Sequence, residues 1–215
     1  MMSPATTVVV VDYGVGNLGS IANILKKVGA SPTVSSSPEE IRNAGKLILP
    51  GVGTFDHGMI RLKEYGLLSA LTTRVLEGGV PILGICLGMQ LMTRSSEEGH
   101  LAGLGWIAAE TVRFAFADAN HSLKVPHMGW NSVRPTKETP LFRDFNCDPR
   151  FYFVHSFHAV CDNEDDVLGR TDYGYSFVSA FQRGNITGVQ FHPEKSHKYG
   201  MTFFSNWLNR VTVND

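Results

Sequence analysis

The chain has 215 residues, of which 43% are hydrophobic, and its formal net charge at pH 7 is -1. This length suffices for one large α/β domain or two small ones. The near-neutral charge, without long basic or acidic runs, argues against nucleic acid or a membrane surface as the main partner. The three cysteines, Cys86, Cys147 and Cys161, are odd in number and lack Cys-x-x-Cys spacing. We therefore expect no disulfide scaffold, no structural zinc site and a reducing, cytoplasmic location.

The start of the chain does not have the pattern of a secretory leader. Residues 1–7 contain no Lys or Arg, and the apolar run behind them is short. No apolar stretch of the sequence is long enough to span a bilayer. We therefore expect no signal peptide and no membrane partner.

The first quarter of the chain alternates between strand and helix patterns. Residues 8–11 are a continuous β-branched run, typical of a strand buried on both faces. Residues 21–28 have helical periodicity, a second strand is expected near residues 32–35, and another helix starts behind Pro38. This order predicts the beginning of a parallel sheet.

A glycine-containing turn joins the first strand to the first helix. Gly14, Gly16 and Gly19 match the dinucleotide-binding pattern G-x-G-x-x-G. That pattern also requires an acidic residue where the second strand ends, and residues 32–35 end in serine instead. The favoured interpretation is a tight turn that also offers backbone to a neighbouring protein, with an NAD-binding module as the alternative.

The strand predicted at residues 46–49 runs into Pro50-Gly51-Val52-Gly53. A Gly-x-Gly at the carboxyl end of a strand can point backbone N–H groups at a developing negative charge. The glycines also let a peptide in this turn rotate at low cost, so that an N–H can point away at rest. A plain glycine turn is the alternative. Helical periodicity resumes over residues 55–76 and is interrupted near Gly66.

Cys86 stands between a predicted buried strand at residues 80–85 and a helical pattern that begins at Met89. Gly84 and Gly88 flank it, as in a nucleophile elbow, the sharp strand-to-helix turn that presents a nucleophile above a sheet. The position before a helix N-terminus favours the thiolate, because the helix dipole is positive there. The alternative is a small buried core cysteine.

From residue 99 the pattern changes to short alternating runs, which indicate antiparallel strands. The further elements expected are a strand at 111–114, an exposed turn at 125–131, a β segment at 151–158, a hairpin of 177–181 and 186–191, and a closing helix at 201–208. No internal repeat or linker is found. The predicted fold is therefore α/β, with a mostly parallel central sheet flanked by helices and an antiparallel β extension, in a single domain of residues 1–215.

A base for Cys86 is available in the stretch Phe191-His192-Pro193-Glu194. If Pro193 keeps this segment extended, residues i and i+2 project to the same side, and the Glu194 carboxylate can orient the His192 imidazole. Cys86, His192 and Glu194 are therefore a candidate catalytic triad. The alternative is a metal site built from His155, His158, His192, Glu194 and His197.

These motifs together resemble the class I, or triad, glutamine amidotransferases. Within that class the resemblance is to the glutaminase subunits that serve a cyclase of histidine biosynthesis, and it covers nearly the whole chain. The stretches that carry it are Asp12-Tyr13-Gly14-x-Gly16-Asn17, Leu49-Pro50-Gly51-Val52-Gly53, Gly84-Ile85-Cys86-Leu87-Gly88-Met89-Gln90, Val125-Pro126-His127-Met128-Gly129-Trp130-Asn131, Tyr152-Phe153-Val154-His155-Ser156 and Gln190-Phe191-His192-Pro193-Glu194-Lys195-Ser196.

The resemblance implies a role for each matched position, with L-glutamine as substrate and no cofactor. Cys86 would attack the carboxamide, His192 would move the proton, and Glu194 would orient His192. The oxyanion would be held by Gly51, Val52, Gly53 and Leu87. The glutamine would be held by Gln90, His155, Ser156 and Phe157. The partner interface would include Asp12, Tyr13, Asn17, Met128, Trp130, Asn131 and Lys195.

The resemblance also implies a partner, a (β/α)-barrel cyclase that forms a heterodimer with this chain and receives the ammonia. One position departs from the family pattern: two aromatic residues usually follow the His-Ser pair, and here they are Phe157 and His158. This departure leaves open a paralogue that supplies ammonia to another synthase, such as an amidotransferase making an amidino sugar for surface polysaccharide.

Overall fold

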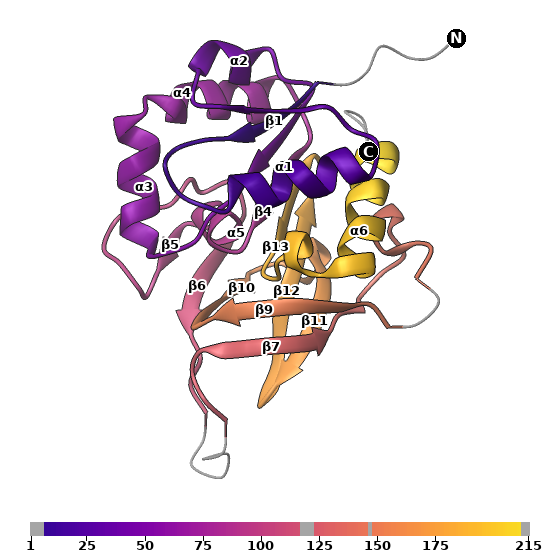
Figure 1. The fold of residues 1–215 in the computed structure, drawn as a ribbon. Helices are drawn as coiled ribbons and strands as arrows, with labels where there is room; N and C mark the ends of the chain where they lie inside the picture. Colours follow the sequence, from indigo (N-terminus) through magenta and orange to yellow (C-terminus); the bar gives the residue numbers. More distant parts are fainter. Residues whose placement is uncertain (1–6, 117–122, 146–147, 212–215) are drawn as a thin grey trace.

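The structure, a computed structural model, describes residues 7–116, 123–145 and 148–211. Within this part, the main sheet has eleven strands, with β2-β1-β3-β4-β13-β12-β10-β6-β5 in order and β11 pairing with β12 and β8. A second sheet consists of β7 and β9 (Figure 1). Within the described residues, no helix is both long and apolar enough to cross a bilayer.

The strands alternate with helices in the first half and follow one another in the second. The strands are β1 (Val8–Val11), β2 (Pro32–Ser35), β3 (Lys46–Leu49), β4 (Ile82–Ile85), β5 (Ser95–Ser96), β6 (Ala109–Arg113), β7 (His127–Ser132), β8 (Arg134–Pro135), β9 (Arg150–His155), β10 (Phe157–Cys161), β11 (Val167–Tyr173), β12 (Tyr175–Arg183) and β13 (Ile186–Val189). The α-helices are α1 (Leu18–Lys27), α2 (Pro38–Arg42), α3 (Phe55–Glu64), α4 (Leu67–Thr72), α5 (Leu87–Leu91) and α6 (His197–Arg210). Short 3-10 or π turns are η1 (Thr73–Glu77), η3 (Pro140–Phe142), η4 (Glu164–Asp166) and η5 (Pro193–Lys195).

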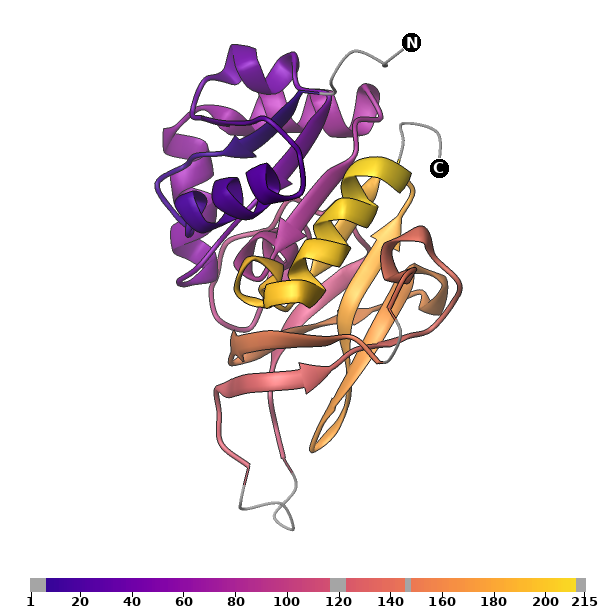
Figure 2. The ribbon, with the colours of Figure 1, turned by 45° about the vertical axis from the view of Figure 1, so that its right-hand side comes forward.

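Strands β2, β1, β3, β4 and β13 run parallel, which confirms the predicted parallel core. All four residues of β1 are buried, because alternate valines enter different cores. Val8 and Val10 pack with α1 and α6, whereas Val9 and Val11 pack in the core that includes α2, α3, α4 and α5. Helices therefore cover both faces of the parallel half, with α1 beside α6 on one face (Figure 2).

Beyond β13 the sheet continues antiparallel through β12, β10 and β6, as the alternating pattern predicted. The β segment expected at residues 151–158 is two strands. It breaks at Ser156, so that β9 pairs with β7 while β10 enters the main sheet. Strand β11 was not predicted from the sequence.

The prediction of an exposed turn at residues 125–131 is wrong. After a cis Val125–Pro126 peptide, residues from His127 onward form strand β7, paired antiparallel with β9. Met128 and Trp130 face outward, but His127 is 3% exposed. Polar residues can occupy the inner face here because hydrogen bonds to other strands satisfy them, which hides the usual alternation of strand sequences.

Candidate active site

Cys86 lies at the tip of a strained turn between β4 and α5. Its φ is 54° and its ψ is -111°, a backbone conformation that is unfavourable for a residue with a side chain. A Cβ on Gly84 would lie 2.8 Å from the carbonyl oxygen of Gly88, and one on Gly88 would overlap the carbonyl oxygen of Leu49. The two glycines therefore let β4, α5 and the end of β3 approach closely, which confirms the elbow geometry.

His192 and Glu194 meet directly, but not for the reason expected from the sequence. The Nδ1 of His192 is 2.8 Å from the Oε1 of Glu194, and each side chain is 2% exposed. The segment is not extended, because Pro193 begins the 3-10 turn η5. The His192 backbone N–H donates to the Tyr152 carbonyl at 2.9 Å, which ties the backbone of His192 to strand β9.

The charge state of His192 follows from its two neighbours. Burial lowers the pKa of His192, but the Cys86 sulfur and the Glu194 carboxylate raise it by more, to about 10. Its Nε2 is buried and has no hydrogen-bond partner among the described residues. The site therefore favours an imidazolium beside the nucleophilic sulfur, which places a proton donor next to the reacting atom.

A cavity of about 320 Å³ opens onto Cys86 and His192. It is lined by residues from both halves of the fold, namely Val52, Gly53, Cys86, Leu87, Gln90, Glu98, Pro126, Val154, His155, Ser156, Phe157 and His192. Glu98 was not predicted. No sequence motif surrounds it, and only the tertiary structure brings it to the cavity wall. Its carboxylate accepts from the Phe55 N–H at 2.9 Å. Burial raises the pKa of Glu98.

Three of the four predicted oxyanion residues line the cavity: Val52, Gly53 and Leu87. Gly51 is buried behind them, where an added Cβ would lie 2.7 Å from the Leu87 Cβ. Gly53 has a φ of +100° and open space around it. A peptide rotation in this turn is therefore better probed at Gly53 than at Gly51, where any side chain would also disturb the elbow.

The predicted glutamine-binding residues also meet at the cavity. Ser156 and Phe157 line it where β9 passes into β10, and Gln90 enters from α5. The Gln90 Nε2 donates to the Phe157 carbonyl at 3.2 Å. The His155 ring reaches the cavity wall but is 6% exposed and is hydrogen-bonded within the protein.

The predicted interface residues divide into exposed and buried groups. Met128 is 62% and Trp130 is 41% exposed on β7, and Lys195 and Asn17 are also exposed. Trp130 stacks on His197 with ring centroids 5.7 Å apart. Asp12 and Asn131 are half-buried.

Tyr13 is a correction to the predicted interface. Its side chain is fully buried, and its hydroxyl donates to the Pro50 carbonyl at 2.5 Å. A tyrosine in an Asp-Tyr-Gly turn looks exposed in sequence, but the turn folds back over the end of β3. Tyr13 therefore supports the Pro50 turn from inside and cannot present its side chain to a partner.

The structure also bears on two alternative interpretations. A Cβ on Gly16 would lie 3.1 Å from the Pro50 ring and one on Gly14 2.6 Å from the Arg61 guanidinium, so these glycines allow close packing. Two of the histidines proposed for a metal site have other partners: His158 bonds to the Tyr175 hydroxyl at 2.7 Å, and His197 stacks on Trp130. In the part of the chain that the structure describes, no group of three or more His, Cys, Asp or Glu residues could hold a metal ion.

Comparison with known proteins defines the class. The family model described as "Glutamine amidotransferase class-I" matches residues 9–211. Two solved structures, both from Thermotoga maritima, share the fold. PurLQS has a TM-score of 0.73 at 19% identity, over 97% of this chain and 100% of that one. A glutamine amidotransferase has a TM-score of 0.63 at 19% identity, over 89% of this chain and 77% of that one. The chain belongs to the class-I glutamine amidotransferases, and it is an enzyme subunit of that class.

Closer relatives define the family within the class. The chain is 48% identical over 204 residues to imidazole glycerol phosphate synthase subunit HisH 2 of Methanococcus maripaludis, covering 95% of this chain and all of that one. It is 50% identical over 204 residues to subunit HisH 2 of Pseudomonas aeruginosa, with the same coverage. It is 45% identical over 198 residues to subunit HisH of Bdellovibrio bacteriovorus, covering 92% and 97%. Within its class, the chain is a member of this HisH family.

The contact between His192 and Glu194 predicts a change in titration. Replacing Glu194→Gln removes a carboxylate that raises the pKa of His192, so this pKa should fall from about 10 toward its ordinary value. NMR of the imidazole over a pH series measures the midpoint. Glu164→Gln, which removes a surface carboxylate paired with Arg170, is the matched control and should leave the midpoint unchanged. An unchanged midpoint in Glu194→Gln would show that the carboxylate does not hold the imidazolium.

Proposed function

We propose that this chain hydrolyses L-glutamine to glutamate and ammonia through Cys86, His192 and Glu194, and that residues 1–215 act as one glutaminase domain. The observation that carries the proposal is the shared cavity. An elbow cysteine at the end of β4 and the histidine of a buried His-Glu pair beyond the neighbouring strand β13 line the same opening. Two free cysteines, Cys86 and Cys161, within the described residues agree with a reducing, cytoplasmic location.

The geometry supports a thioester mechanism. The Cys86 thiolate attacks the carboxamide carbon, and the carbonyl oxygen becomes an oxyanion beside the backbone of Val52, Gly53 and Leu87. His192 gives its proton to the nitrogen as the C–N bond breaks, and ammonia leaves. Water then attacks the thioester with His192 as the base, and cleavage of the C–S bond releases glutamate and restores the thiolate beside protonated His192.

The direct test is replacement of the nucleophile. Cys86→Ala should reduce glutamine hydrolysis by several orders of magnitude while the fold survives, because triad members act as a unit. A glutamine-analogue electrophile should label Cys86 and spare Cys161, whose pKa is raised by burial to about 12. Cys147, which should also be spared, lies outside the described residues. Retained hydrolysis in Cys86→Ala, or preferential labelling elsewhere, would refute the assignment.

We further infer that Glu98 contacts the α-ammonium group of glutamine. Its carboxylate lines the same cavity as Gln90 and Ser156, and burial makes a carboxylate without a positively charged partner unfavourable there. A substrate ammonium would compensate that cost. The backbone of residues 155–157 and the Gln90 side chain complete the wall that would hold the α-carboxylate and the carboxamide.

Glu98→Gln should therefore act on binding. Losing a charge-assisted hydrogen bond costs about 1.5–3 kcal/mol, so KM for glutamine should rise about ten- to a hundredfold with a smaller change in kcat. The substrate analogue without the α-amino group should be affected far less by the substitution. Glu97→Gln, at the exposed neighbour, is the matched control. Equal losses on both substrates would place Glu98 outside the binding role.

We propose that the partner in a heterodimer is a (β/α)-barrel cyclase, with imidazole glycerol phosphate as the product made from the ammonia. The exposed Met128 and Trp130 on β7, with Lys195 on η5, form the surface that supports this proposal. His158 is the departure from the family pattern that left open a different synthase as the acceptor of ammonia. It is 4% exposed and bonds to Tyr175 inside the antiparallel half. It does not line the cavity, so it gives no support to a different synthase.

The partner should control the rate. Glutamate production should be lowest for the chain alone, higher with its cyclase, and highest with the cyclase plus acceptor substrate. The reason is that one misaligned oxyanion donor costs about a hundred- to a thousandfold in rate, and the partner would align it. Gly53→Ala should lose this activation, since its φ of +100° is strained for alanine although the space is open. Gly19→Ala, in open space on α1, is the control. Equal rates in all three conditions would exclude gating.

A further inference from the structure

A third side chain reaches the nucleophilic sulfur. The Nε2 of Gln190 lies 3.6 Å from the Cys86 Sγ, within hydrogen-bond range for sulfur. Gln190 follows the last residue of β13, is fully buried, and its backbone N–H donates to the Ser179 carbonyl at 2.9 Å. The triad mechanism makes no use of this amide, although it contacts the atom that reacts.

The orientation of the amide follows from a backbone carbonyl. The Phe157 oxygen can only accept, so Gln90 must present its NH2 group there, at 3.2 Å. The second hydrogen of that group goes to the Gln190 Oε1 at 3.0 Å. With its oxygen used in this way, Gln190 turns its own NH2 group to the sulfur. The contact with Cys86 is therefore a donated N–H.

The same carbonyl also accepts from the first of two buried histidines that are hydrogen-bonded to each other. The His155 Nδ1 lies 2.7 Å from the Phe157 oxygen and must donate to it. The His155 Nε2 then accepts from the His127 Nδ1 at 3.0 Å, and the His127 Nε2 accepts from the Asn131 Nδ2 at 3.3 Å. Burial lowers the pKa of both rings, that of His127 to about 4, so both are neutral at pH 7 and each tautomer is defined.

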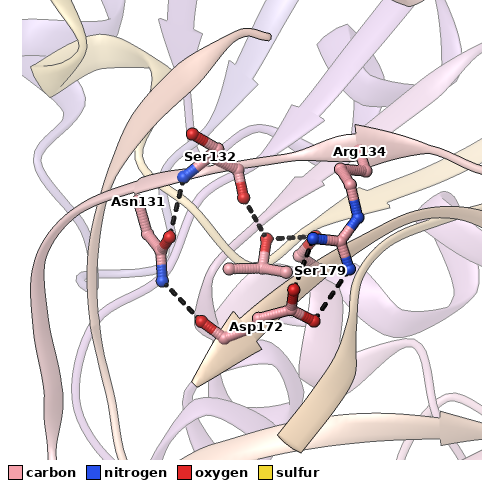
Figure 3. A network of polar contacts seen from close by, with 6 residues as sticks. Asn131, Ser132, Arg134, Asp172 and Ser179 are labelled. Carbon is pink, nitrogen blue, oxygen red and sulfur yellow. Dashed lines mark hydrogen bonds and ion pairs between the residues drawn. The ribbon is translucent and has the colours of Figure 1, made fainter. Parts of the chain in front are cut away.

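Asn131 fixes the outer end of this chain of hydrogen bonds on β7. Its Oδ1 accepts from the Ser132 N–H at 2.8 Å, and its Nδ2 also donates to the Asp172 carbonyl at 2.9 Å (Figure 3). The Asp172 carboxylate in turn accepts from both terminal guanidinium nitrogens of Arg134. Trp130, the exposed residue before Asn131, lies on the surface assigned above to the partner.

We propose, building on the glutaminase function above, that Gln190 is a further catalytic residue that donates a hydrogen bond to the Cys86 thiolate. His155 and His127 are positioning residues. Their hydrogen bonds run from β7 to the Phe157 carbonyl, which orients Gln90 and thereby the Gln190 amide. A thiolate accepts hydrogen bonds more strongly than a thiol, so this donor stabilises the attacking form and restricts the direction of the sulfur. The amide is uncharged and takes no proton, which leaves proton transfer to His192.

The test compares full-length variants in complex with the cyclase. Gln190→Met removes the amide at similar size, and Gln190→Glu keeps an acceptor for Gln90 while removing the donor. The rate of Cys86 alkylation by iodoacetamide is measured over a pH series, together with kcat and KM for glutamine. The other titratable groups that face the sulfur, His192 and Tyr13, are unchanged. Gln182→Met, on neighbouring β12, is the matched control.

We expect Gln190→Met to lower kcat about tenfold with little change in KM, and to raise the pH midpoint of alkylation by about one unit, the shift that a tenfold change in ionisation equilibrium produces. Gln190→Glu should raise the midpoint further, because a carboxylate repels the thiolate. His127→Phe should shift it in the same direction by less, with exposed His57→Phe as its control. If Gln190→Met does not fold, Gln190→Glu decides the outcome.

A wild-type midpoint in the Gln190 variants, even with reduced activity, would overturn the proposal, since a merely structural role lowers activity without moving the ionisation of the sulfur. The two proposals fail separately. Hydrolysis retained by Cys86→Ala refutes the glutaminase assignment. An inactive Cys86→Ala together with an unshifted midpoint in Gln190→Glu refutes only the role of Gln190.

Discussion

The strained backbone of Cys86 is the feature on which the rest of the site depends. A φ of 54° at a residue with a side chain persists only where surrounding contacts determine it. Here the Cys86 N–H donates to the Val189 carbonyl at 2.8 Å, and Gly84 and Gly88 permit the close approach of α5 to β3 and β4. The parallel sheet thus stabilises the turn, and the turn places the sulfur above the sheet edge at the start of α5.

Electrostatics then determine the charge of His192. His192 is buried, which alone would favour a neutral imidazole, but Glu194 and the sulfur reverse that preference. A buried ion pair is stable only when its charges and hydrogen bonds are matched. The Glu194 Oε1 supplies one partner of His192, and the Cys86 sulfur contributes a second favourable interaction with the imidazolium. The same arrangement would prepare both the nucleophile and the proton donor that ammonia release needs.

The β7–β9 sheet links this chemistry to the surface. Strand β9 carries His155 and leads into the cavity wall at Ser156, while β7 carries the exposed Met128 and Trp130 on its other face. Alternate residues of β7 therefore face two environments, with polar side chains on the inner face and apolar side chains on the outer face. A partner that moves β7 would act on the Phe157 carbonyl through groups that are already hydrogen-bonded to it.

Features that depend on local patterns could be predicted from the amino-acid sequence. The valine run of β1, the glycines around Cys86 and the His-Pro-Glu stretch indicated the parallel core, the elbow and the triad, because strand burial, turn sterics and short-range pairing act over a few residues. Tertiary structure alone decided which distant groups join them. Gln190 lies 104 residues from Cys86 in the chain, and Glu98 has no motif around it. In the sequence, Tyr13 and His127 look like surface residues, but in the fold Tyr13 is buried against the end of β3 and His127 against β9. The sequence does not show this because burial of a polar group depends on distant hydrogen-bond partners, which no local pattern contains.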